Sequence, residues 1–275
     1  MPRGSAPLAQ LLDATKGRIG LDDYLARVRT AMARPLPSLA QLIDSEKGGT
    51  LLICGGGPSI GDLAQLKTLR HLARKGGKVW AVNKTHDFLL TKGIVPWGAC
   101  LLDPMPWVAG YIKRPRRDVK YFVASQCHGD VFSALKNANV YLWHAGIDVD
   151  GEGYPVKLLA EEYPGCDWHV VPGPTTVGLR SIMVGYSLGF RTFHLFGCDS
   201  SLKVGEGDAR LYAYDKAKPK DAPERWVTLR TRAGDQRFLT NSHMARQTMD
   251  FEHMVDQIAA MVNQRQMEPI RIIVH

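Results

Sequence analysis

Short apolar runs alternate with amphipathic stretches from Thr50 to the end of the chain. Between the runs, residues such as Leu63, Leu66 and Leu69 recur at helical spacing. Short, nearly all-apolar strands separated by helices are typical of a parallel sheet covered on both faces. The pattern therefore predicts an α/β protein with a Rossmann-like open, mainly parallel sheet. The expected strands are residues 51–54, 79–82, 99–102, 121–124, 140–143, 192–196 and 270–274.

Two segments depart from this rhythm. Residues 1–48 contain short helical patterns interrupted by Pro35 and Pro37, and residues 200–240 are polar and basic. We therefore expect a helical arm over 1–48 and a Rossmann-like nucleotide-binding transferase domain over 49–275, with 200–240 as a lid-like insertion. Within the insertion, residues 227–232 and 236–240 predict a hairpin, and residues 242–264 predict a closing helix. The arm is expected either to pack on the core or to join copies of the chain into a homo-oligomer.

Composition narrows the classes of function. The chain carries 35 basic and 27 acidic residues, a formal charge of +8, which favours anionic partners such as nucleotides, nucleic acid or acidic sugars. Five cysteines without a CxxC pair indicate free thiols rather than a zinc or disulfide framework. No apolar run approaches the roughly 20 residues of a membrane span, and no secretory signal is evident. These features together predict a cytoplasmic protein.

A glycine-rich turn follows the first expected strand and is the main candidate binding site. The strand runs into Gly55, Gly56 and Gly57, and then into Pro58 and Ser59. Glycines let the backbone approach a phosphate, while free amides and a following helix supply partial positive charge. The turn is neither a Walker A loop nor a GxGxxG fingerprint, which disfavours an NAD enzyme. The alternative is a plain tight turn between strand and helix.

Two further strand ends carry polar groups. Asn83 and Lys84 follow the second expected strand and are suited to a ribose or base and to a phosphate, respectively; a helix cap with a solvated lysine explains them equally well. Asp103 ends the third strand before Pro104 and is a candidate catalytic carboxylate or Mg²⁺ ligand, with turn capping as its alternative role.

The second half of the chain adds the remaining candidates. Thr175 and Thr176 begin a helix and predict a second anion cradle. Asp199 ends the strand at 192–196, where it is the better of the two aspartates for catalysis or for holding Mg²⁺. His243 begins the closing helix and is a candidate general base, although a structural role is the commoner one for a lone histidine. The donor-binding set is completed by two polar neighbours, Ser200 and Asn241.

These motifs, taken in order, resemble a known family. Residues 53–60, 81–104, 174–201 and 239–255, with Phe251 and Glu252, resemble the motility-associated-factor glycosyltransferases and the 6-hydroxymethylpterin diphosphokinase-like domain. The same order is similar to that of bacterial CMP-sialic-acid-dependent sialyltransferases. The resemblance covers most of residues 50–258 and leaves the N-terminal arm outside.

The resemblance implies a nucleotide donor held by the glycine turn, Asn83 and the threonine pair. In the sialyltransferase-like case it implies His243 as the base, with Tyr212 and Tyr214 near the leaving phosphate. Two departures are visible: the sialyltransferases have asparagine in the middle of the turn, and the motility-factor pattern has small residues after Asn83. A carboxylate cluster of the pterin diphosphokinase type is also missing from the sequence.

Three functions remain open from the sequence. The leading one is transfer of a sugar from a nucleotide-sugar to an acceptor hydroxyl on a glycan, a small molecule or a nucleic acid. The second is ATP-dependent diphosphate transfer to a hydroxymethyl group, with Asp103 and Asp199 holding Mg²⁺ as the only cofactor expected. The third is a non-catalytic module that binds a nucleotide or nucleic acid, motivated by the basic charge.

Overall fold

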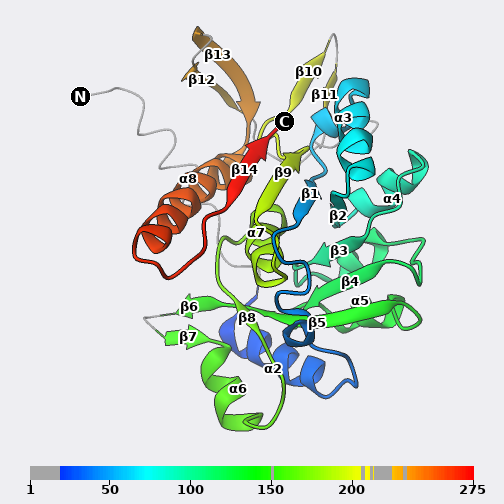
Figure 1. The fold of residues 1–275 in the computed structure, drawn as a ribbon, viewed down its shortest axis with the longest axis vertical. Helices are drawn as coiled ribbons and strands as arrows, with labels where there is room; N and C mark the ends of the chain where they lie inside the picture. Colours follow the sequence, from blue (N-terminus) through cyan, green and yellow to red (C-terminus); the bar gives the residue numbers. More distant parts are fainter. Residues whose placement is uncertain (1–18, 150–151, 206–207, 211–212, 214–224, 232–233) are drawn as a thin grey trace.

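The computed structural model describes residues 19–149, 152–205, 208–210, 213, 225–231 and 234–275 (Figure 1). Its centre is an eight-stranded sheet in the order β14-β9-β1-β2-β3-β4-β5-β8. Every neighbouring pair in this sheet is parallel, which confirms the expected α/β architecture. The strands are β1 (Thr50–Cys54), β2 (Lys78–Val82), β3 (Gly98–Leu101), β4 (Lys120–Ala124), β5 (Asn139–Ala145), β8 (Val170–Val171), β9 (Thr192–Phe196) and β14 (Arg271–Val274).

The strand order reverses at β1. From β1 the chain proceeds through β2, β3, β4 and β5 in one direction, whereas β9 and β14 lie on the other side of β1. Cys54, the last residue of β1, is in register with Phe196 on β9 and Ala81 on β2. Open α/β sheets bind their ligands outside the carboxyl ends of the strands at such a switch point.

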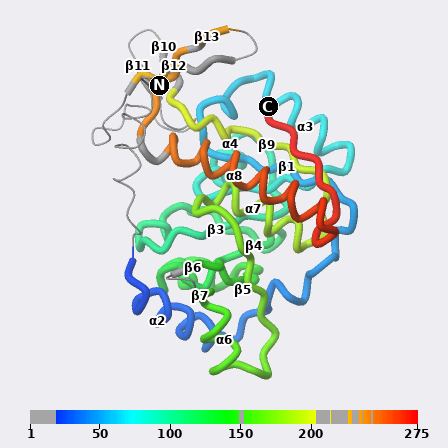
Figure 2. The backbone as a smooth tube through the Cα atoms, turned by 90° about the vertical axis from the view of Figure 1, so that its left-hand side faces the viewer, coloured from blue at the N-terminus to red at the C-terminus, as the bar shows by residue number. Residues whose placement is uncertain are grey.

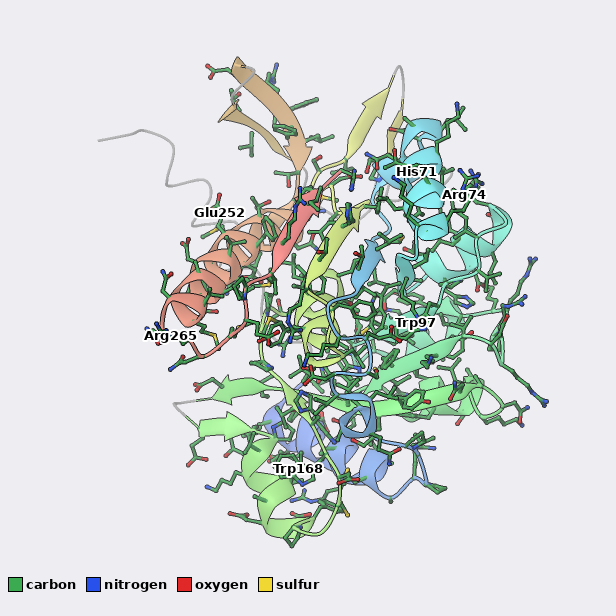
Figure 3. The ribbon with its side chains drawn as sticks, viewed as in Figure 1. His71, Arg74, Trp97, Trp168, Glu252 and Arg265 are labelled. Atoms are coloured by element: carbon green, nitrogen blue, oxygen red, sulfur yellow. The ribbon has the colours of Figure 1, made fainter. Side chains whose placement is uncertain are left out.

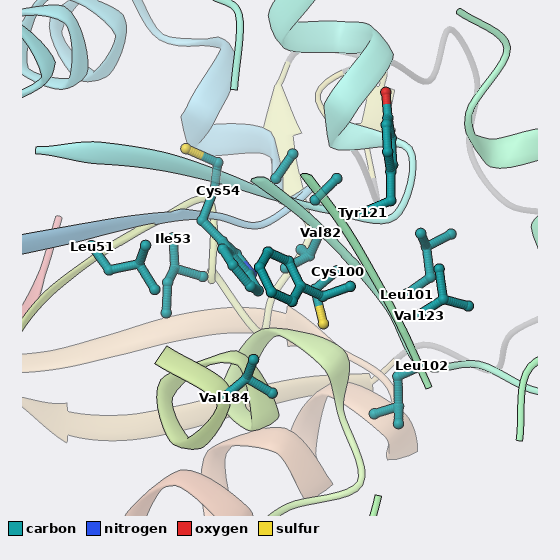
Figure 4. Packing of buried hydrophobic residues seen from close by; sticks show 14 of the residues in the cluster. Leu51, Ile53, Cys54, Val82, Cys100, Leu101, Leu102, Tyr121, Val123 and Val184 are labelled. Carbon is teal, nitrogen blue, oxygen red and sulfur yellow. The ribbon is translucent and has the colours of Figure 1, made fainter. Parts of the chain in front are cut away.

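Helices cover both faces of the sheet. α7 (Val177–Ser187) packs on β1, β2 and β3, while α3 (Leu63–Arg74) and α4 (Thr85–Thr91) pack on β1 and β2. Figure 4 shows Val184 on α7 facing the buried side chains of the strands, among them Leu51 and Ile53. Trp80 is fully buried in the same layer and donates from Nε1 to Ser181 Oγ at 3.0 Å.

Gly185 of α7 makes a close contact with this core. A Cβ at Gly185 would lie 2.7 Å from Leu51 Cδ2 and 2.8 Å from Phe193 Cε1. A Cβ at Gly178 would instead reach Cys198 Sγ at 4.0 Å, which is an ordinary contact. The packing of α7 on the sheet therefore explains Gly185.

The described part of the N-terminal arm is joined closely to the sheet. α2 (Leu21–Met32) shares a small second core with α6 (Val156–Glu162), and Tyr24 Oη donates to Ala145 O at 2.7 Å. Further along, Ser38 forms a parallel bridge with Leu142 of β5. A short 3-10 helix, η1 (Leu39–Leu42), follows this bridge.

The C-terminal half contains the long helix α8 (Ser242–Asn263) and the expected hairpin, β12 (Arg225–Thr231) with β13 (Gly234–Thr240). Both views place this hairpin and the pair β10 (Lys203–Gly205) and β11 (Asp208–Arg210) at one end of the molecule, where α8 begins (Figure 2). The hairpin β6 (Ile147–Val149) with β7 (Glu152–Tyr154) and the short helix α5 (Gly129–Ala134) complete the fold.

The state of the cysteines and the character of the helices agree with what the sequence predicts. All five cysteines are free, with Cys54, Cys100 and Cys127 buried and Cys166 exposed. Within the described ranges, no helix has the length and apolar character needed to cross a membrane.

Candidate functional site

The predicted site residues gather at the carboxyl edge of neighbouring strands. The glycine turn follows β1, Asn83 follows β2, Asp103 follows β3, and Asp199 follows β9. The register pairs Cys54 with Ala81 and with Phe196, so the glycine turn lies between the segments that follow β2 and β9. The switch point of the sheet therefore brings together segments that are far apart in the sequence.

Asp199 is bound directly to the glycine turn. Its Oδ2 accepts the backbone N–H of Ser59 at 2.8 Å, and its Oδ1 accepts the Ser59 hydroxyl at 2.5 Å. A carboxylate that accepts two hydrogen bonds from one residue fixes that residue firmly. The two predicted site residues thus form one unit, which we call the Asp199–Ser59 clasp.

The glycines of the turn have a packing role in this clasp. A Cβ at Gly57 would lie 2.5 Å from Asp199 Oδ2 and 2.7 Å from Gly197 O, and one at Gly55 would clash with Gly197 O. Gly197 itself has φ +61°, the left-handed region that favours glycine. Close approach of two backbones therefore explains Gly55, Gly57 and Gly197.

The amides expected to bind phosphate already have partners inside the protein. Gly55 N donates to Phe196 O at 2.7 Å, Gly57 N donates to Gly197 O at 2.8 Å, and Ser59 N is held by Asp199. The turn also leads into a single 3-10 turn, η2 (Pro58–Gly61), and α3 begins only at Leu63. The helix expected after the turn is therefore separated from it by this 3-10 turn.

Asn83 presents an unsatisfied acceptor at the same edge. Its backbone is left-handed, with φ +51°, and its N–H donates to Cys100 O at 3.2 Å. Its Oδ1 is buried and has no hydrogen-bond partner among the described residues, and the same holds for the hydroxyl of the fully buried Thr85. The alternative role of helix cap fails for this side chain, because Lys84 is the N-cap of α4 and no side chain caps it.

The flanking residues have identified contacts. The ammonium of Lys84 lies 5.0 Å from the ring centroid of Tyr111. Asp103 Oδ1 accepts the backbone N–H of Met105 at 3.0 Å, which is the turn-capping role considered for it. Arg27 of α2 donates from Nη1 to Pro104 O, and it thereby ties the arm to the segment that follows β3.

The threonine pair begins α7 without capping it. Thr176 is the N-cap of α7, yet its side chain makes no capping hydrogen bond. Thr175 Oγ1 donates to Asp250 Oδ2 of α8 at 3.3 Å, so the two helices are linked at this point.

Of the predicted site residues in and near the start of α8, some make structural contacts, and others have side chains outside the described part of the structure. Asn241 Oδ1 accepts the N–H of Met244 at 3.1 Å and caps α8, which is the ordinary role considered for it. Ser200, with φ +49°, donates from Oγ to Gln247 Oε1 at 3.3 Å. The His243 backbone lies in the first turn of α8, whereas its side chain is outside the described part of the structure, as are Tyr212 and Tyr214.

Comparison with known families shows to which family the chain belongs. A family model described as 6-hydroxymethylpterin diphosphokinase MptE-like matches residues 25–205. The chain belongs to this MptE-like family. The match includes the Asp199–Ser59 clasp, Asn83, Asp103 and the threonine pair, but it ends before His243. It also begins inside α2, so part of the arm that the sequence resemblance left out lies within the family segment.

A solved structure supports the fold of this MptE-like chain. The MAf glycosyltransferase from Magnetospirillum magneticum AMB-1 matches with a TM-score of 0.55 and 16% identity. The alignment covers 87% of this chain but only 35% of that protein, so this chain spans about a third of its length. At this identity the likeness shows the fold alone. No curated protein sequence matches the chain. The family description names a diphosphokinase, which is a transferase, and the family therefore supports that reaction class.

The MptE-like segment also contains a buried arginine whose role the sequence did not reveal. Arg180 is only 3% exposed, and burial lowers its pKa to about 10. Its Nε donates to Pro174 O at 2.7 Å, and its Nη1 donates to Val171 O and Gly146 O. It therefore joins the segments that follow β5 and β8 to the start of α7. An arginine within the apolar stretch of that helix is the sequence signal for it.

Buried histidines are the other residues that the sequence did not single out. His144 on β5 is almost fully buried, its Nδ1 lies 2.9 Å from Ser125 Oγ, and burial lowers its pKa to about 4. His86 lies 3.0 Å from Tyr121 Oη through Nε2, and burial lowers its pKa as well. Both histidines are therefore neutral at physiological pH.

Proposed function

We propose that this MptE-like protein binds a nucleotide-activated sugar at the carboxyl edge of β1, β2 and β9 and transfers the sugar to an acceptor hydroxyl. The observation that carries the proposal is Asn83, which follows the strand next to β1 and whose buried Oδ1 has no hydrogen-bond partner within the described part of the chain. An unmade hydrogen bond of this kind costs about 1–3 kcal/mol. A ligand N–H or O–H that reaches Oδ1 would recover that free energy.

The chemistry of the ligand follows from the group that is unsatisfied. A side-chain carbonyl oxygen accepts hydrogen bonds, so it suits a ribose hydroxyl or an exocyclic amine of a base. The Thr85 hydroxyl, buried nearby without a partner, both donates and accepts. Asparagine is one of the few residues that tolerate a left-handed backbone, and the strand end has this backbone at position 83.

The donor phosphate is assigned to the start of α7. Its N-cap Thr176 leaves the hydroxyl uncommitted to capping, and an α-helix N-terminus attracts anions. In the glycine turn, the Gly55, Gly57 and Ser59 amides are occupied by the last residue of β9 and by the segment that follows it, so α7 is the better phosphate site in this conformation.

The proposed reaction is a direct displacement. The acceptor oxygen forms a bond to the anomeric carbon, while the bond from that carbon to the donor phosphate breaks and the nucleotide leaves with the electron pair. His243, in the first turn of α8, is proposed to take the acceptor proton as general base. Donors at the start of α7 would stabilise the charge that develops on the leaving phosphate.

Diphosphate transfer from ATP is the second candidate, and the family description supports it. Its Mg²⁺ would be held by Asp103 and Asp199. Both carboxylates lie at the same edge, but Asp103 Oδ1 and both oxygens of Asp199 already accept hydrogen bonds from the protein. Among the described residues, no group of three or more His, Cys, Asp or Glu could hold a metal ion. The two aspartates therefore fit Mg²⁺ only if substrate phosphates supply the other ligands.

A calorimetric binding panel separates these candidates. The full chain is titrated with CMP, CDP, UDP, GDP and ATP, each with and without Mg²⁺. Sugar transfer predicts tight binding of one nucleoside mono- or diphosphate in the absence of Mg²⁺. Binding of ATP only with Mg²⁺ would replace it with diphosphate transfer. Failure of every nucleotide to bind, together with salt-sensitive binding of RNA or DNA, would favour the non-catalytic module.

A further inference from the structure

A cavity lies between α2 and the segment that leads into α5, and one of its lining residues, Arg27, also contacts the segment that follows β3. Its volume is about 210 Å³. One wall is a face of α2 with residues at helical spacing, and the other is the segment that leads into α5. The side chains that matter for its chemistry are Arg27, Thr30, Arg34, Cys127, His128 and Phe132.

Two arginines, Arg27 and Arg34, give the cavity a positively charged wall. Arg27 Nη1 donates to two backbone carbonyls, Pro104 O and Gln126 O. Arg34 lies over the ring of Phe132, with Cζ 4.8 Å from the centroid. Among the described residues, neither arginine forms an ion pair. Two carboxylates lie near the lining residues: Asp130 Oδ2 lies 3.2 Å from His128 Nδ1, and the charge of Asp103 acts on Cys127.

Arg34 also holds an unsatisfied donor. Its Nε is buried, and no residue that the structure describes accepts a hydrogen bond from it. Its Nη2 would lie 3.6 Å from a Cβ built on Gly129, so the guanidinium reaches across to the start of α5. A buried cationic donor without an acceptor is costly, whereas an oxyanion placed between the arginines would satisfy it.

We propose that this cavity binds a phosphate group through Arg34 and Arg27. A guanidinium presents several N–H donors in a plane, and this geometry matches the oxygens of a phosphate. Arg27 uses Nη1 for the two carbonyls, so its other nitrogens remain for the ligand. His128, at the other wall, has its Nδ1 3.3 Å from the Asp130 backbone nitrogen and 3.2 Å from Asp130 Oδ2.

The size of the cavity limits the ligand. Pockets for whole small-molecule ligands usually measure about 300–1,000 Å³, and this one is smaller. It therefore suits free phosphate or the phosphate end of a phosphomonoester rather than a complete nucleotide. The proposal does not depend on the transferase reaction, because the cavity lies at α2 and α5 and not at the strand ends of β1, β2 and β9.

Calorimetric titration of the full chain with inorganic phosphate tests the site. Glycerol 3-phosphate is titrated in parallel, and the ionic strength is held constant with NaCl. Wild type is compared with R34Q, which removes the charge, and R34K, which keeps it. The matched control is R74Q on α3, which Figure 3 shows far from α2. Circular dichroism establishes that each variant is folded.

We expect wild type and R74Q to bind phosphate in the millimolar range or tighter. R34Q should bind at least about tenfold more weakly, because charged hydrogen bonds are lost, and R34K should lie between them. Tighter binding of glycerol 3-phosphate than of phosphate would identify a phosphomonoester as the ligand, and the reverse would identify the free ion. Equal binding by wild type and R34Q, or binding of neither compound by wild type, would overturn the proposal.

Discussion

Asp199 and Ser59 form two short hydrogen bonds at the switch point, and their geometry depends on the positions of single atoms. In the clasp, Asp199 Oδ2 lies only 2.5 Å from the position that a Cβ on residue 57 would occupy. Sequence reasoning treated the three glycines as a phosphate cradle and Asp199 as a catalytic carboxylate. The structure shows that they are two halves of one contact between β1 and β9.

Substituting Gly57→Ala tests that contact. The new methyl group would meet both Asp199 Oδ2 and Gly197 O, so the clasp has to shift or break. Overpacking of this kind costs about 1–3 kcal/mol, and we expect the free energy of unfolding in urea to fall by that amount. Gly165→Ala is the control, since a Cβ there meets nothing within 4 Å. A Gly57→Ala variant as stable as the Gly165→Ala variant would show that the clasp is dispensable.

At the scale of elements, the sequence pattern predicted most of the sheet. Strands of four or five buried apolar residues stand out because both of their faces are covered. The residues 51–54 and 192–196 were placed within one residue of β1 and β9. The hairpin of β12 and β13 and the helix α8 were also predicted correctly, because turn residues and helical periodicity are local signals.

Elements that depend on tertiary contacts escaped prediction. β8 has only two residues and pairs with the end of β5, and β6 with β7 forms a hairpin of three-residue strands. Such short strands carry too little periodicity to be recognised. The packing of α2 on Ala145 and Pro104 also depends on tertiary contacts, because the apolar pattern of a helix does not specify which surface the helix covers.

The candidate site divides in the same way. The sequence predicted that Asn83, Asp103 and Asp199 follow the ends of strands, and the structure confirms that position. Sequence could not show which donors and acceptors are already satisfied inside the protein. Asn241 proved to be a cap, whereas Asn83 proved to have an empty acceptor. That distinction depends on neighbours from other strands, and no spacing rule encodes it.

At the scale of the whole molecule, buried histidines make stability depend on pH. Burial lowers the pKa values of His144, His86 and His169 below the ordinary value of 6.5, to about 4 for His144. The folded state therefore binds fewer protons than the unfolded state between these values. Stability is fully present above about pH 6.5 and is lost as the pH falls toward 4. For His144 alone the loss is about 3 kcal/mol.

Chemical unfolding at about pH 7 and about pH 5 measures this linkage. We expect wild type to be less stable at the lower pH and the variant H144Q to lose less on acidification. H71Q is the control, since His71 is exposed on α3 (Figure 3). An H144Q variant with the same loss between the two pH values as wild type would mean that this histidine is not the acid-sensitive group.

The central claim is that Asn83 binds the nucleotide donor, and Asn83→Gly tests it most directly. Glycine keeps the left-handed backbone at φ +51° and removes only the side-chain amide. The measurement is the Kd of the nucleotide that the wild type binds, determined by calorimetry on both proteins. The account predicts a Kd about tenfold higher for Asn83→Gly, with the fold retained. An unchanged Kd would contradict it and place the donor elsewhere on the sheet edge.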